Sequence, residues 1–359
     1  METQVVDDAL FVSFANFQAL RQAARRAALG KRRKPGAAAF LARLEPELLA
    51  MEQALQTGTW RPGGYTSFLV HDPKPRTVSA APFRDRVVHH ALCHVIQPLF
   101  ERRFIHDSYA NRLGKGTHAA VARYETFRDR YRFVLRCDIY RYFPAVDHAV
   151  LKQDIARVVR CSQTLRVIGH IIDGSNPQEP VLIHYPGDDL FTPHERRRGL
   201  PIGNLTSQLF ANVYLDPIDH LVKDRLRAPG YVRYVDDLAI FHNDPHALRD
   251  IRDALHDALA ARRLSLHPRK TWLAPTSDPS RFLGFELHSD GRRRLPADNV
   301  ARFRNRLRGL RDRWWAGTVT EAEIRQRVGA WVAHASHAHT RRLRLAMFAS
   351  GWFDPTDTR

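Results

Sequence analysis

The sequence predicts an α+β fold in which short strands that end in acidic residues alternate with amphipathic helices. Residues 230–241 hold two strand-like apolar runs with the adjacent carboxylates Asp236 and Asp237 between them, which is typical of a β-hairpin with acids at its tip. Residues 133–143 hold another apolar run, which leads into Asp138. From Pro296 onward, apolar and basic residues recur at helical spacing. An Asp-Asp pair alone is also common in surface turns, so the remaining motifs must decide its role.

Composition favours a polyanionic partner. The chain has 359 residues, with 56 lysines and arginines against 38 acids, a formal charge of +18 and a pI of about 10.5. Nucleic acid is the leading partner class, although coding bias can also enrich arginine. The first twenty residues lack a secretory pattern and no window approaches a membrane span, so we expect a cytoplasmic protein. The three cysteines predict neither disulfides nor a zinc site.

The N-terminal part predicts helices followed by a hairpin. Residues 9–29 and 36–56 read as two helices separated by the Gly30–Pro35 break. The seven basic residues of 21–34 form either a solvated helix face or an RNA-contacting arm. Residues 65–70 and 76–79 predict two strands, and Lys74 and Arg76 beside their turn either clamp a triphosphate or remain plain surface cations.

The middle of the chain predicts helices separated by irregular loops. A mostly buried helix opens at Phe83, and its histidines lack the acidic or cysteine partners of a metal site. A second helix spans about 147–160, and we interpret Asp188-Asp189 in the irregular stretch 173–195 as a solvated turn. The glycine-punctuated basic loop 196–208 then leads into an apolar helix.

The C-terminal part predicts one capped helix, two strands and a basic helical segment. Asp244-Pro245 is a helix start, and residues 264–272 and 282–287 predict two further short strands. In the last segment the apolar residues fall on one helix face, namely Phe303, Leu307, Leu310 and Trp314. Arg304, Arg308 and Arg311 fall on another face, which fits either a nucleic-acid backbone or ordinary solvation.

Asp138, the Gly203 loop and Tyr234-Val235-Asp236-Asp237, in that order, resemble the palm motifs of reverse transcriptases. The resemblance covers roughly residues 40–352 and implies a right-hand polymerase with fingers, a palm built on an antiparallel sheet, and a helical thumb. The expected division is an N-terminal helical extension at 1–57, fingers at 58–132, palm at 133–295 with an insertion around 160–198, and thumb at 296–359. Three acids close together would resist joint ionisation without a metal.

The resemblance implies an RNA-directed DNA polymerase, a nucleotidyltransferase that uses dNTPs, an RNA template and a DNA or RNA primer. Nucleotidyl transfer needs two divalent cations, here Mg²⁺ with Mn²⁺ as a substitute, held by Asp138, Asp236, Asp237 and the Ile139 carbonyl. Lys270 would protonate or stabilise the leaving pyrophosphate, and the bulk of Phe143 would exclude a ribose 2′-hydroxyl. The implied nucleotide-binding residues are Lys74, Arg76, Phe143, Ile202, Gly203 and Gln208, and Arg304, Arg308 and Arg311 would bind nucleic acid.

The loop also indicates a subfamily. Related enzymes carry glutamine before the loop glycine, whereas this chain has Ile202, and its Ile-Gly-Asn-Leu-Thr-Ser-Gln loop resembles the reverse transcriptases of diversity-generating retroelements. Such enzymes make cDNA with errors concentrated at adenines and work with a small basic accessory variability protein. The alternatives are an unaffiliated bacterial reverse transcriptase in antiviral defence with a non-coding RNA, and a non-catalytic RNA-binding module.

Overall fold

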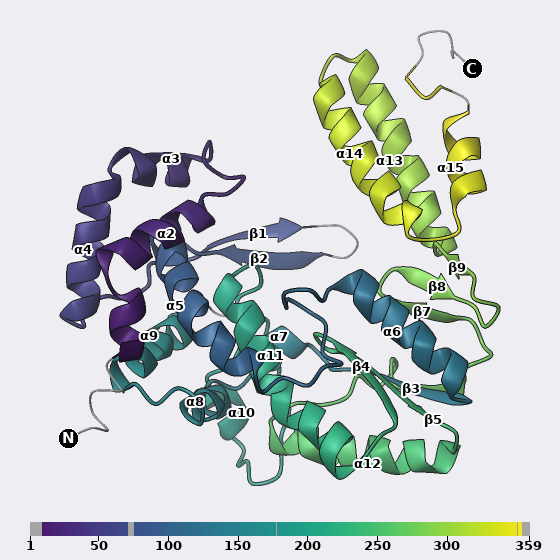
Figure 1. The fold of residues 1–359 in the computed structure, drawn as a ribbon, viewed down its shortest axis with the longest axis horizontal. Helices are drawn as coiled ribbons and strands as arrows, with labels where there is room; N and C mark the ends of the chain where they lie inside the picture. The colour runs from purple at the N-terminus through teal and green to yellow at the C-terminus, as the bar shows by residue number, and fades with distance from the viewer. Residues whose placement is uncertain (1–8, 71–74, 177, 350, 354–359) are drawn as a thin grey trace.

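The computed structural model describes residues 9–70, 75–176, 178–349 and 351–353, and the predicted Lys74 lies outside these ranges. Figure 1 shows helices at the N-terminal side, a sheet with helices on both faces in the middle, and a separate helical bundle at the C-terminal side. None of the helices in these ranges is long and apolar enough to cross a bilayer.

The N-terminal extension differs from the two predicted helices. Residues 9–14 are helical, and α2 (Phe17–Ala27), α3 (Pro35–Ala42) and α4 (Leu44–Gln56) follow. The predicted first helix is interrupted because the Asn16 side chain accepts a hydrogen bond from the Ala19 N–H and so caps a new helix. The predicted second helix is interrupted at Arg43, whose backbone is not helical.

The predicted hairpin is confirmed as β1 (Thr66–Val70) and β2 (Arg76–Ala80), which pair antiparallel from Thr66 opposite Ala80 to Val70 opposite Arg76. The helix predicted from Phe83 is α5 (Phe83–Glu101), which packs against α2 and against α11 (Leu205–His220). The α11 helix includes both Asp216 and Asp219. It runs through Pro217 and continues as the π-helical turn η1 (Leu221–Arg225).

A four-stranded antiparallel sheet forms the centre of the molecule, in the order β4 (Gly230–Tyr234), β5 (Asp237–His242), β3 (Phe133–Asp138) and β6 (Trp272–Pro275). Side chains along a strand alternate between its two faces. Leu238 and Ile240 accordingly join the core that includes α12 (Pro245–Ala261), whereas Ala239 and Phe241 join the core that includes α6 (Thr117–Arg130). Figure 1 shows these two helices on opposite sides of the sheet.

Two strand predictions after this sheet are wrong in detail. Within 264–272 only Trp272 lies in a strand, because Pro268 interrupts the stretch and Leu266 forms only an isolated bridge with Ile139. Residues 282–287 are not one strand: β7 (Ser280–Phe282) and β8 (Phe285–Leu287) form a hairpin. Leu283 and Gly284 both have positive φ, as a two-residue hairpin turn requires. The third strand of this small sheet is β9 (Arg293–Arg294).

The remaining elements between β3 and α11 are short helices. They are α7 (Tyr142–Ala145), α8 (His148–Ala156), α9 (Ser162–Asp173) and α10 (Thr192–Glu195). The interpretation of Asp188-Asp189 as a solvated turn is wrong for Asp188. Its side chain is 1% exposed and pairs with Arg196 and Arg263.

The C-terminal segment is a bundle of α13 (Ala297–Trp315), α14 (Glu321–Ser336) and α15 (Arg341–Phe348). Phe303 of α13 stacks on Trp331 of α14 with ring centroids 3.9 Å apart, and Leu307 and Leu310 are also buried. Trp314 was predicted on this apolar face but is 37% exposed, because it lies one turn beyond the last buried position of α13.

Candidate active site

The antiparallel register brings the predicted acids together. Asp138, the last residue of β3, lies opposite Asp237, the first residue of β5, and Asp236 lies in the turn between β4 and β5. The Ile139 N–H donates to the Asp236 carbonyl over 3.2 Å, which fixes the residue after β3 against this turn. Residues 234–237, which we call the acidic turn, therefore face the end of β3.

The backbone of the acidic turn is strained. Val235 has φ of +55°, a left-handed conformation that is unfavourable for a β-branched residue. Arg233 donates from Nη1 to the Val235 carbonyl over 3.1 Å and so ties down this conformation. Strain at a turn that presents carboxylates is typical of functional sites.

A fully buried ion pair holds Arg233, the residue that precedes the acidic turn. Arg233 donates from Nε and Nη2 to the two carboxylate oxygens of Asp219 in α11, over 2.7 and 2.6 Å, and both side chains are 0% exposed. The Tyr231 hydroxyl donates to the same carboxylate, and Asn212 accepts from Arg233. Sequence reasoning missed this network, since a strand arginine and a helix aspartate give no local sign that they pair.

A second arginine holds Asp237. Arg136 of β3 donates from Nη2 to an Asp237 carboxylate oxygen over 2.6 Å and from Nη1 to the Arg281 carbonyl over 2.8 Å. Its guanidinium also lies over the Tyr124 and Phe282 rings. Asp237 is thus tied to the β7–β8 hairpin through Arg136, another contact that the sequence did not predict.

The predicted catalytic lysine lies at the site. Lys270 donates from Nζ to both carboxylate oxygens of Asp138 over 3.0 Å, although 132 residues separate the two in sequence. The lysine side chain is half exposed. It therefore lies at the solvent side of the acidic turn, where it can reach both a carboxylate and a bound anion.

The electrostatics of the turn show excess negative charge. Burial, the Asp138 carboxylate and the Asp237 carboxylate together raise the pKa of Asp236 to about 6. Burial also raises the pKa of Asp237, although its ion pair with Arg136 opposes this rise. The two cations of the site thus do not fully offset its three acids.

The residues at the turn fit a divalent cation of the Mg²⁺ type in donor chemistry. Asp138 and Asp236 offer carboxylate oxygens and Ile139 offers a backbone carbonyl, an all-oxygen set. No three acidic, histidine or cysteine side chains in the described ranges form a ready-made metal group, and the bond to Arg136 directs one oxygen of Asp237 away from such a role. Asp138 and Asp236 are the better-placed ligands.

The Gly203 loop joins the site to the β1–β2 hairpin. The Leu200 N–H donates to the carbonyl of Phe143, which is half-buried in α7, and the Ser79 N–H of β2 donates to the Ile202 carbonyl over 2.9 Å. Gly203 has φ of +112°, and a Cβ there would lie 2.8 Å from Val78, so only glycine fits this close approach. The loop therefore connects α7 and β2.

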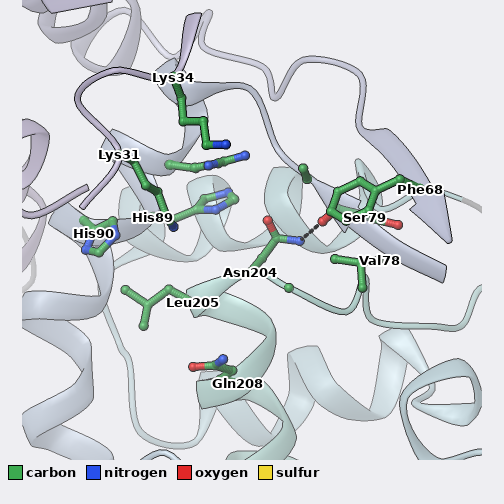
Figure 2. A pocket seen from close by; sticks show the side chains of 13 residues that line it. Lys31, Lys34, Phe68, Val78, Ser79, His89, His90, Asn204, Leu205 and Gln208 are labelled. Carbon is green, nitrogen blue, oxygen red and sulfur yellow. Dashed lines mark hydrogen bonds between the residues drawn. The ribbon is translucent and has the colours of Figure 1, made fainter. Parts of the chain in front are cut away.

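Gly203 and Gln208 also line a cavity of about 610 Å³, whose remaining walls come from β1, β2, α5 and the loop before α3 (Figure 2). None of the three acids lines it. The structure thus places these two predicted nucleotide-binding residues at a cavity that sequence reasoning did not find.

The other predicted binding residues lie on β2 and α13. Arg76 is exposed at the start of β2. Arg304 and Arg308 are exposed on α13, and the Arg311 guanidinium lies 5.0 Å from the Trp315 ring centroid. Figure 1 places α13 in the C-terminal bundle, apart from the sheet.

Comparison with known proteins gives matching sequences and similar structures. The sequence profile described as reverse transcriptase (RNA-dependent DNA polymerase) matches residues 71–287. The chain is 23% identical over 288 residues to protein YkfC of Escherichia coli K12, which covers 68% of this chain and 72% of that protein. It is 18% identical over 338 residues to the putative COX1/OXI3 intron 1 protein of Saccharomyces cerevisiae, covering 78% of this chain and 39% of the relative.

Among solved structures, apo telomerase from Candida tropicalis matches with a TM-score of 0.49 at 11% identity, over 64% of this chain and 48% of that one. The chain thus spans less than half of the telomerase chain and of the yeast intron protein.

Proposed function

Because the chain belongs to the reverse transcriptase family, we propose that it copies an RNA template into cDNA by adding dNTPs to a DNA or RNA primer. The observation that carries this proposal is the meeting of Asp138 and Asp236 at adjacent strand ends, with Lys270 bonded to Asp138. A half-exposed lysine beside partly buried acids provides both signs of charge at one point, as transfer of a nucleotide requires.

Each residue of the acidic turn has a proposed task. Two Mg²⁺ ions, or Mn²⁺, would supply the positive charge that stabilises the reacting phosphate. Asp138, Asp236 and the Ile139 carbonyl would hold them, and Asp237 would keep the turn in place through Arg136. The primer 3′-hydroxyl would lose its proton to solvent as its oxygen bonds to the α-phosphorus and the bond to pyrophosphate breaks, and Lys270, released from Asp138, would give the leaving group a proton.

We further propose that the enzyme belongs to a diversity-generating retroelement and makes cDNA with errors at template adenines. The support is Ile202, an apolar residue before the loop glycine whose carbonyl accepts from Ser79 in the fingers hairpin. In this proposal the protein is cytoplasmic and works with a small basic accessory protein. Arg304, Arg308 and Arg311 would lie along the backbone of the nucleic acid, and Arg76 would contact the triphosphate.

Two measurements test these proposals separately. Primer extension on an RNA template with dNTPs and Mg²⁺ tests the polymerase, and the absence of product from the folded protein would refute it. Sequencing of that cDNA tests the subfamily, since errors spread evenly over the four template bases would remove the retroelement assignment. Neighbouring DNA with defence genes and no near-repeat pair differing at adenines would favour a role in antiviral defence.

A further inference from the structure

The cavity beside β2 combines positive charge with an apolar wall. The side chains of Lys31 and Lys34 lie on one side, and Phe68 and Val78 lie on the other (Figure 2). Arg86 also lines this space. We call this space of about 610 Å³ the basic cavity. It is large enough for a nucleotide, and its lining offers cations for a phosphate and apolar surface for a base.

A buried histidine in the lining has no partner. His89 is 1% exposed, and neither ring nitrogen has a hydrogen-bond partner among the described residues. Burial, with help from the nearby His90 and Arg86, lowers the pKa of His89 to about 3, so its ring is neutral and offers one donor and one acceptor. A buried polar group left unpaired is costly, which is why such groups in native proteins point to a missing ligand or solvent partner.

The two lysines that line the cavity are also without an acidic partner among the described residues. Neither the Lys31 nor the Lys34 ammonium pairs with an acid in the part of the chain that the structure describes. The charge of Lys31 affects a neighbouring side chain, because burial and then Arg26 and Lys31 lower the pKa of His90. The cavity therefore favours an anionic group at its lysine side.

The cavity shares a wall with the loop that reaches the catalytic region. Asn204 donates from its side-chain amide to the Ser79 carbonyl over 3.0 Å, and the Ser79 N–H bonds to Ile202, the residue before Gly203. A ligand in the basic cavity would therefore lie beside the loop that holds Ile202 and Gly203.

We propose that the basic cavity holds one unpaired nucleotide of the RNA template ahead of the position being copied. Lys31 and Lys34 bind its phosphates, Phe68 and Leu205 pack against its base, and His89 hydrogen-bonds its uncharged polar edge. The inference rests on the proposed polymerase function. It gives a binding role to the basic loop before α3, to which that function by itself assigns none.

Binding of primer–template duplexes tests the proposal. The full chain is titrated, without dNTPs, with fluorescent duplexes that either carry a single-stranded RNA template overhang or are blunt. The test variant is Lys31→Gln/Lys34→Gln. The matched control is Arg32→Gln/Arg33→Gln, which removes the same charge from the same exposed loop at positions that do not line the cavity.

We expect the lysine variant to lose affinity for the overhang duplex alone. Each phosphate contact on a single strand contributes about 0.7 to the slope of log affinity against log salt, so the slope should fall by about 1.4 for two lost contacts. His89→Phe should weaken overhang binding about two- to tenfold without changing the salt slope, since it removes a hydrogen-bonding group and no charge.

Three results would overturn the assignment. Equal losses in the arginine control, or equal losses for blunt duplexes, would make the loop a diffuse basic surface. Displacement of the overhang by a free nucleoside monophosphate at similar concentration would assign the cavity to soluble nucleotides. Primer extension by the unmodified chain is measured in parallel. If the overhang binds but no product forms, the polymerase proposal fails and the cavity proposal does not.

Discussion

The acidic turn and the basic cavity are two charged regions joined by one loop, and they differ in whether their charged groups are paired within the chain. In the acidic turn, Lys270 bonds to Asp138 and Arg136 bonds to Asp237 within the chain. In the basic cavity, the lysines have no acidic partner among the described residues and His89 has no hydrogen-bond partner there. The acidic turn pairs two of its acids with cations of the chain, whereas the lysines and His89 of the basic cavity have no such partner among the described residues.

This difference shows how the fold can prepare a reaction. Acids that approach one another need internal cations before any ligand arrives, because their mutual repulsion would otherwise destabilise the folded chain. Lysines at an open cavity remain hydrated and need no such partner. Substitutions in the acidic turn should therefore change stability and catalysis together, whereas substitutions in the basic cavity should change binding alone.

The largest expected effect comes from the ion pair under the acidic turn. Asp219→Asn leaves the buried Arg233 charge without its carboxylate, and we expect a loss of about 3–5 kcal/mol in the free energy of unfolding. Urea denaturation measures this loss. Asp253→Asn, which breaks an exposed pair with Arg252, is the control and should cost less than about 1 kcal/mol. Equal losses in the two variants would show that the buried pair is not what supports the turn.

The second prediction concerns Asp236 itself. Its folded pKa of about 6 exceeds its ordinary value of 3.8, so the folded chain binds more protons between these values and loses stability as the pH rises through them. Without divalent cations, Asp236→Asn should remove this loss and be more stable at neutral pH, by up to roughly 3 kcal/mol. Unfolding across that pH window measures the difference. Parallel pH profiles for the two proteins would contradict the proposed repulsion.

These supporting contacts also mark what the sequence could predict. The acids and Lys270 were predicted together because they occupy recognisable motifs, and the structure places Lys270 at Asp138. Arg136 and Asp237 are 101 residues apart, and nothing local to either signals their contact. The same holds for Arg233 and Asp219 and for His89, whose functional interest comes from the lack of a partner in three dimensions.

The secondary structure shows the same difference between local signals, which the sequence contains, and long-range contacts, which it does not. The β1–β2 hairpin and the Asp244-capped helix α12 were predicted because turn and cap residues act locally. The break at Asn16 and the exposed position of Trp314 were missed, since a regular apolar pattern continues through both. Helix ends and faces are decided by capping and by the neighbouring helix, which a periodic pattern does not contain.

The third prediction tests the residue that links α7 to the loop between the two regions. If the Phe143 ring excludes the ribose 2′-hydroxyl, Phe143→Ala should raise incorporation of ribonucleotides relative to deoxynucleotides by about tenfold or more. Competitive single-nucleotide extension measures the ratio. Phe191→Ala, at a ring that is 64% exposed, is the control. An unchanged ratio in Phe143→Ala would remove this residue from the nucleotide site.

The smallest expected effect lies at Ile202, on the same loop. If Ile202 faces the new base pair as proposed, Ile202→Gln supplies a hydrogen-bonding side chain there, and one net hydrogen bond changes selection about two- to tenfold. We expect fewer errors, chiefly at template adenines, with polymerisation largely kept. Leu190→Gln, at an exposed leucine, controls for the added amide. Equal adenine error rates in active enzymes would refute the role of Ile202 and weaken the retroelement proposal.

Primer extension by Asp236→Ala on an RNA template with Mg²⁺ tests the central claim most directly. Asp257→Ala, which removes an acid that is 87% exposed on α12, is the matched control. The account predicts that Asp236→Ala melts no lower than the unmodified chain and extends primers at least about a hundredfold more slowly, while Asp257→Ala stays active. Near-unmodified extension by folded Asp236→Ala would show that the acidic turn is not where the nucleotide is transferred.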